Sequence, residues 1–286
     1  MTRFGPAGNS DSFFEQGLRH THQVPEYLAA MGLTAFEYQC GRGVRISDDK
    51  AAELGRLAAE RGIALSLHAP YYISLSGTDP EKRRGSIEYI LQSARAVTAM
   101  GGDRIVVHSG SCSKISREQA LQLACDTMRQ ALASLDEAGY GAVRICPEVM
   151  GKINQLGTLE EVLTLCELDE RMIPCVDFGH YNARTFGGLR TFEDYKAIFE
   201  AIENRLGLSR LRELHCHFSK IEYTEKGGEK RHLTLEDTTF GPDYEPLAQL
   251  LARYGCSAVI ICESDGTQAE DASTMMRYYN SLILEK

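Results

Sequence analysis

Short apolar segments alternate along the chain with longer segments in which apolar residues recur every three or four positions. The short segments predict β-strands: Arg3–Pro6, Ala35–Tyr38, Ala64–His68, Arg104–His108, Val143–Glu148, Met172–Asp177, Glu213–His217 and Ala258–Glu263. The longer segments predict amphipathic helices: Lys50–Arg61, Glu81–Met100, Arg117–Ala138, Leu159–Leu165, Phe192–Arg205 and Tyr244–Tyr254. Repeated strand–helix alternation predicts an α/β fold, a (β/α)8 TIM barrel that forms one domain over residues 1–286.

Residue types that bind metals stand where the predicted strands end. The set contains six of the eight histidines and three acids: His68, His108, Glu148, Asp177, His180, His215, His217, His232 and Glu263. TIM barrels carry their chemistry at the carboxyl ends of the strands, so we expect these side chains to meet there. Imidazole together with carboxylate favours zinc, with manganese or iron as close rivals. The pattern therefore predicts a metal-dependent enzyme.

Composition and charge give information on location, thiol state and binding partners more than on the fold. No run of 18 or more apolar residues occurs, and Met1 to Gln16 lacks the apolar core of a signal peptide. We therefore expect no membrane span, and a cytoplasmic, monomeric protein. The nine cysteines include no CxxC pair and predict buried reduced thiols. A net charge of −9 counts against a purely electrostatic nucleic-acid binder, although bound divalent ions would add positive charge at the site.

Four local strings carry a resemblance to a known family. They are His68 followed by Tyr71, His108-Ser109-Gly110-Ser111, Glu148 with the glycine-rich loop to Gly157-Thr158, and Asp177-Phe178-Gly179-His180. From about His68 to the C-terminal helix, the chain resembles the endonuclease IV family of abasic-site endonucleases, within the xylose isomerase-like barrel superfamily. The resemblance implies a zinc-dependent phosphodiester hydrolase. Its partner would be a damaged DNA duplex, incised 5′ of an abasic site.

The resemblance also implies roles for individual residues. His68, His108 and Glu148 would hold a first zinc, and Glu148, the catalytic residue, would bridge to a second zinc held by Asp177, His215 and Glu263. A third zinc would use His180, His232 and the aspartate of an Asp-Arg-His string. This chain reads Lys230-Arg231-His232 there, so Glu229 or His217 is the candidate replacement, and two or three ions are expected. Tyr71 and Arg42 are the candidates for contact with DNA.

A long segment without predicted helix or strand, Ser219–Gly241, is rich in Lys, Glu, Thr and Gly and contains His232. A loop of this length inside a compact domain is usually functional or disordered. We therefore expect an irregular loop that reaches the site.

A sugar isomerase or epimerase on the same barrel is the main alternative. Glu148, Asp177, His215 and Glu263 also resemble the one-metal site of ketose 3-epimerases, and the substrate would then be a small sugar or sugar phosphate. His68, His108 and His232 favour several ions, because a one-metal site does not need them. Another metal-dependent hydrolase or lyase, and a non-catalytic barrel that binds a ligand, are further alternatives, since a fold alone does not determine function.

Overall fold

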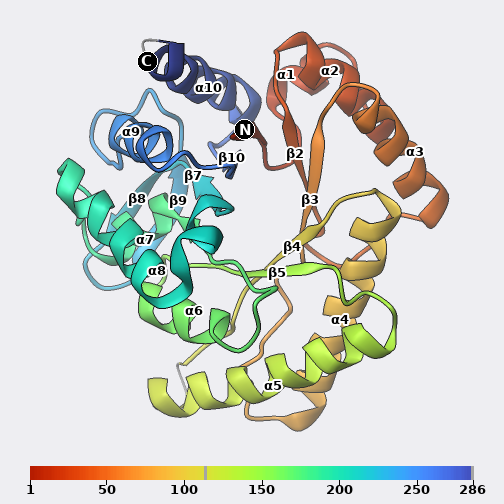
Figure 1. Cartoon of the computed structure of the whole chain (residues 1–286), viewed down its shortest axis with the longest axis vertical. Helices are drawn as coiled ribbons and strands as arrows, with labels where there is room; N and C mark the ends of the chain where they lie inside the picture. Colours follow the sequence, from red (N-terminus) through yellow and green to blue (C-terminus); the bar gives the residue numbers. More distant parts are fainter. Residues whose placement is uncertain (113–114, 285–286) are drawn as a thin grey trace.

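The computed structural model describes residues 1–112 and 115–284, and its centre is a ring of parallel strands (Figure 1). The strands are β1 (Arg3–Pro6), β2 (Ala35–Gln39), β3 (Ala64–His68), β4 (Arg104–Val107), β5 (Arg144–Pro147), β6 (Cys175–Asp177), β7 (His215–Phe218) and β10 (Val259–Cys262). They pair in the orders β2-β3-β4-β5 and β1-β10-β7-β6. Single bridges from Ala7 to Glu37 and from Glu148 to Cys175 close the two gaps. The predicted TIM barrel is confirmed.

Helices surround the strands as an outer layer (Figure 1). They are α1 (Asp11–Glu15), α2 (Val24–Ala30), α3 (Asp48–Ala59), α4 (Pro80–Ala99), α5 (Arg117–Glu137), α6 (Leu159–Cys166), α7 (Phe178–Arg184), α8 (Phe192–Arg212), α9 (Glu245–Tyr254) and α10 (Gln268–Leu284). On α4, the spacing of Ile90, Ala94 and Val97 places all three on one face, and all three are fully buried. None of the described helices is long and apolar enough to cross a membrane.

The register between strands sets the depth of each inward-facing side chain. On β7, His215 and His217 are both fully buried, and the two are separated by a residue that faces the opposite side. β6 pairs with β7 so that Cys175 lies beside His215 and Asp177 lies beside His217. The barrel therefore has an upper layer with Asp177 and His217 and a deeper layer with Cys175 and His215.

The segment between β7 and α9 is more regular than the sequence predicted. It contains an antiparallel hairpin of β8 (Lys220–Thr224) and β9 (Gly228–Leu233), so the expectation of an irregular loop was wrong. At Gly228, φ is +74° and a Cβ atom would lie 2.2 Å from the Gly151 carbonyl oxygen. Only glycine accommodates both the left-handed backbone and this close approach. The hairpin thereby packs against the loop that follows β5.

Candidate metal centre

Three groups of ligand-type side chains gather at the carboxyl ends of the strands. They are His68, His108 and Glu148; Glu148, Asp177, His217 and Glu263; and His180, Glu229 and His232. Within each group, one possible ligand atom of every residue lies within 4.8 Å of the others. Because Glu148 belongs to two groups, those two are contiguous.

Glu148 is the centre of this arrangement. Its side chain follows β5 and is 1% exposed. Its Oε2 lies 2.9 Å from His108 Nε2 and 3.3 Å from His68 Nε2, and its Oε1 lies 3.2 Å from Nδ1 of both His180 and His217. Burial alone would raise the pKa of Glu148, but the neighbouring imidazoles, His108 foremost, hold it well below its usual range. The carboxylate is therefore ionised and has both oxygens directed at imidazoles.

Three histidines have one ring nitrogen tied to a partner outside the metal groups. The Nδ1 atoms lie 2.9 Å from the Ala69 carbonyl for His68, 3.1 Å from the Val149 carbonyl for His180, and 2.9 Å from the Ser219 hydroxyl for His232. A ring nitrogen that donates to a carbonyl leaves the opposite nitrogen with its lone pair, the usual arrangement in metal-binding histidines. For His68 and His180, Nε2 is therefore the nitrogen that faces the mouth of the barrel, the opening at the carboxyl ends of the strands.

The second group contains His217 in the position where His215 was expected. His217 Nδ1 lies 3.2 Å from Glu148 Oε1 and 3.6 Å from Glu263 Oε2. His215 instead lies one layer deeper, with Nε2 2.9 Å from Glu37 Oε2. Both imidazoles face inward as predicted, but two residues of strand separate them by roughly 6.6 Å along the barrel. Only His217 reaches the mouth.

In the third group, the carboxylate comes from Glu229. Its Oε2 lies 3.4 Å from His180 Nε2. Lys230, the next residue of β9, forms an ion pair with Glu222 across the hairpin. Neighbouring residues of a strand project to opposite sides, so the Lys230 cation faces away from the histidines. Glu229 was one of the two expected replacements for the missing aspartate, and the other, His217, lies in the second group.

Glu37 on β2 is a site residue that the sequence analysis missed. It is fully buried and accepts hydrogen bonds from Ser66 Oγ at 2.9 Å and Gln39 Nε2 at 3.2 Å, besides its contact with His215. Burial would raise its pKa, but the charge of His217 and the hydrogen bond with His215 hold the pKa well below its usual range. The available signal was a lone acid within the apolar segment Ala35–Tyr38.

Tyr71 and Arg42 lie together at the rim of the mouth. Arg42 Nε donates to the Tyr71 hydroxyl at 3.1 Å, and Tyr71 is 48% exposed. Tyr71 lines a cavity of about 230 Å³ together with His68, Glu148 and other residues of the three groups. A larger hollow of about 580 Å³, with Arg104 in its lining, opens at the amino-terminal ends of the strands. We take the smaller cavity as the site, because barrel chemistry takes place at the carboxyl ends.

The free energy of unfolding of the metal-free protein should fall as the pH rises. Burial alone would lower the pKa of His68 and His180, but Glu148 raises that of His68 to about 9, and Asp177 and Glu148 raise that of His180 to about 10. Unfolded histidine titrates near pH ~6.5, so the folded metal-free chain binds more protons between about 6.5 and 10. This contribution to stability is complete below pH ~6.5 and is lost as the pH rises through 9 to 10.

Denaturant unfolding of EDTA-treated protein at about pH 6.5 and pH 9.5 measures this effect. We expect the free energy of unfolding to fall by a few kcal/mol, because one pKa unit corresponds to about 1.4 kcal/mol. His68→Gln should reduce the fall. Zinc-loaded protein should show a smaller fall, because histidines that bind a metal are already neutral. Equal stability of the metal-free protein at the two pH values would contradict the prediction.

Sequence comparison identifies the family of this chain. Residues 25–281 match the family model described as xylose isomerase-like TIM barrel. An uncharacterized protein of Methanocaldococcus jannaschii, MJ0133, is 33% identical over 282 residues, which cover 99% of this chain and 98% of that protein. A probable endonuclease 4 of Acholeplasma laidlawii is 31% identical over 181 residues. The match covers 60% of each chain, so this chain spans less than two thirds of that relative's length.

Solved structures with a similar fold include an endonuclease IV and a sugar epimerase-like protein. Endonuclease IV from Thermus thermophilus superposes with a TM-score of 0.68 at 18% identity, covering 99% of this chain and 100% of that one. A D-tagatose 3-epimerase-like protein superposes with a TM-score of 0.69 at 18% identity, covering 91% and 93%. At this level of identity the similarity shows the fold alone. The choice between the two chemistries therefore depends on the side chains at the mouth.

Proposed function

Because this chain belongs to the xylose isomerase-like TIM barrel family, we propose that it is a metal-dependent hydrolase of the endonuclease IV type that incises duplex DNA 5′ of abasic sites. The observation that carries this proposal is the presence of three neighbouring ligand groups, two of which share Glu148 while the third contacts it through His180. A one-metal sugar epimerase would use only the group of Glu148, Asp177, His217 and Glu263. The remaining histidines would then be buried or half-buried imidazoles without a metal to bind.

The three groups are suited to zinc, with manganese as the alternative. Imidazole and carboxylate ligands are the usual zinc set, and no thiolate is present in the three mouth groups formed by the described residues. When bound, such ions would activate water for attack and stabilise charge on the phosphate and leaving oxygen. Glu148 would keep the first two ions adjacent, since each of its oxygens faces a different pair of imidazoles.

Recognition of the lesion would depend on the rim and on the size of the mouth. The exposed ring of Tyr71 can stack on a base beside the lesion, and Arg42 can pair with a backbone phosphate. The cavity of about 230 Å³ lies below the range of roughly 300–1,000 Å³ that is typical of ligand pockets. It suits a sugar-phosphate unit that lacks a base, which is also the cheapest unit to flip out of a duplex.

The second candidate function is epimerisation of a ketose. It is favoured by one specific observation, the compact group with two glutamates on either side of His217 and Asp177, which a single ion could occupy. In that case the substrate would be a small sugar or sugar phosphate, and one ion per chain would suffice for activity.

Cleavage of a fluorescent duplex with one tetrahydrofuran abasic analogue tests the proposal. We expect incision 5′ of the analogue, loss of incision after EDTA treatment, and recovery when zinc is added back. An undamaged duplex of the same sequence is the matched control and should stay intact. If zinc-loaded protein leaves the damaged duplex intact, the endonuclease proposal is overturned. A screen of ketoses with singly loaded protein then tests the second candidate.

A further inference from the structure

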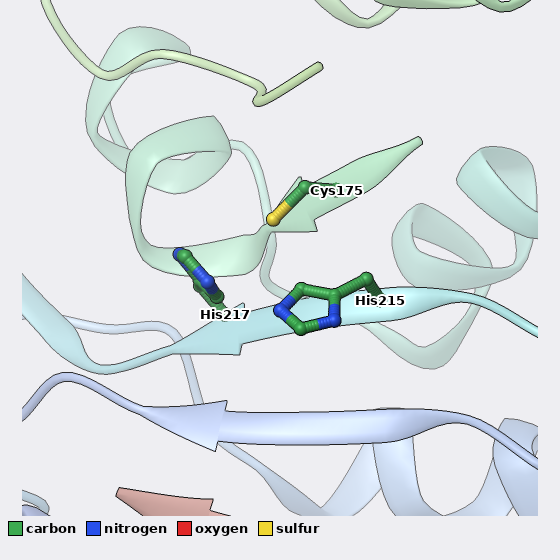
Figure 2. A group of neighbouring side chains, drawn as sticks. All are labelled: Cys175, His215 and His217. Atoms are coloured by element: carbon green, nitrogen blue, oxygen red, sulfur yellow. The ribbon is translucent and has the colours of Figure 1, made fainter. Parts of the chain in front are cut away.

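A second cluster of metal-binding side chains lies one layer below the mouth. Cys175 on β6 points toward His215 and His217 on β7 (Figure 2). One possible ligand atom from each of the three lies within 4.8 Å of the other two, and all three residues are fully buried. Glu37 approaches the same imidazoles from β2, at 2.9 Å from His215 Nε2 and 3.0 Å from His217 Nε2.

This deeper layer is unusually polar for the interior of a barrel. The inward-facing layers of a TIM barrel are normally filled by branched apolar side chains. Here, a thiol on β6 and an imidazole on the adjacent β7 face a carboxylate from β2, with His217 one layer above. Within the part of the chain that the structure describes, His215 Nδ1 is buried without a hydrogen bond, and His217 Nε2 is buried without a hydrogen bond of good geometry although Glu37 Oε1 lies 3.0 Å away. Most buried polar atoms in proteins have a partner, so two such atoms in one cluster require an explanation.

We propose that Cys175, His215 and His217 form a structural zinc site beneath the mouth, with Glu37 orienting the His215 ring through its Nε2 atom. One ion would give His215 Nδ1, the His217 imidazole and the Cys175 thiol a common partner. Cysteine and histidine are the usual ligands of structural zinc. This site shares His217 with the second mouth group, and its existence does not depend on which substrate the mouth accepts.

Charge and ligand chemistry both favour Zn²⁺ here. A thiolate with imidazoles selects zinc or cuprous ions over magnesium, calcium or manganese. Binding would displace the thiol proton to solvent, so that the thiolate and the Glu37 carboxylate together balance two positive charges. A monovalent cuprous ion would leave one net negative charge in the barrel core, which is costly to bury.

His217 connects this cluster to the mouth. Its Nδ1 faces Glu148 and Glu263, whereas its Nε2 faces Glu37. A neutral imidazole has one lone pair, so with Nε2 on the lower ion the Nδ1–H of His217 would donate to a carboxylate of the mouth. An ion below would fix the ring in the orientation that presents Nδ1 to the mouth, in the way that outer partners orient metal-binding histidines.

Cobalt substitution tests the proposed site, because a cysteine thiolate bound to Co²⁺ gives an intense near-ultraviolet charge-transfer band. The full chain is refolded with excess Co²⁺ and dialysed, and its absorbance and cobalt content are measured. We expect the band in the wild type, and its loss in Cys175→Ser together with one bound ion per chain. Cys146→Ser is the matched control, because Cys146 is equally buried in the same apolar cluster but belongs to none of the ligand groups.

Two results would overturn the proposal. One is a cobalt-loaded wild type without the band, which requires no variant to fold. The other is a band that persists in Cys175→Ser. X-ray absorption of zinc-loaded wild type provides a second measurement, in which a sulfur ligand supports the site and an all-nitrogen and oxygen shell excludes it. Cobalt retained in the mouth without the band would reject this site while leaving the proposed hydrolase untouched.

Discussion

Glu148→Gln should reduce metal-dependent incision by at least about 100-fold, since loss of residues that only orient metal ligands already costs 10–100-fold. The carboxylate contacts four imidazoles from both of its oxygens. Glutamine has nearly the same shape but is neutral, and its amide nitrogen cannot bind a cation. We therefore expect two adjacent ion positions to weaken together, and elemental analysis should show a lower metal content in the same samples.

The control for this substitution is Glu167→Gln. It also removes one carboxylate, but Glu167 pairs with Arg205 on the outer surface of the barrel. We expect it to retain wild-type metal content and activity. Circular dichroism shows whether Glu148→Gln is folded. A folded Glu148→Gln protein with more than a tenth of wild-type activity would contradict the bridging role of Glu148.

Glu229→Gln should selectively remove the third ion. Glu229 is the carboxylate of the group formed with His180 and His232 and belongs to no other mouth group. We expect one bound ion fewer per chain, and incision lowered by roughly 10–100-fold if that ion takes part in the chemistry. Metal analysis after dialysis and single-turnover incision assays measure the two effects separately.

The matched control is the adjacent residue of the same hairpin, Lys230. Lys230→Gln removes a charge that faces Glu222 on the opposite side of β9, so metal content should stay unchanged. If both variants lose the same amount of metal, the hairpin as a whole, rather than the Glu229 carboxylate, determines occupancy. If Glu229→Gln keeps every ion, the third group does not bind metal.

The hydrophobic pattern was sufficient to predict the barrel. The segments Arg3–Pro6 and Ala64–His68 are strands with the predicted bounds, and six predicted helices occupy the outer layer. Period-two and period-3.6 patterns are local, so they can be read without knowledge of the fold. Direction also followed from the sequence, because chemistry-bearing residues stood at the carboxyl ends of the strands.

Depth inside the barrel could not be predicted in the same way. His215 and His217 have the same periodicity and the same residue type, and only the register with β6 shows which of them is level with Asp177. Glu37 is far from both in sequence, and one acid in an apolar strand gives no indication of its partners. Parallel pairing between distant strands decides these contacts, and no local pattern contains that information.

The hairpin was missed because few of its residues are apolar. Lys220-Ile221-Glu222-Tyr223 does alternate, but Thr224 to Arg231 is polar throughout and gives no strand signal. Its pairing is stabilised instead by contacts such as the bridge between Lys152 and Gly228. The direction of Lys230 followed from that pairing, and the sequence alone could not provide it.

The hairpin also makes the ligand groups of the mouth differ in how easily they open. Two of the ligand groups lie on barrel strands or directly at their ends. Their residues can separate only when the barrel core unfolds. Glu229 and His232 are carried by a two-stranded ribbon outside the barrel, and an isolated hairpin is marginally stable in water. Local opening of this ribbon needs far less free energy than global unfolding. The third ion would therefore exchange with solvent fastest, and zinc supply could regulate the mouth through that position while the other two stay filled.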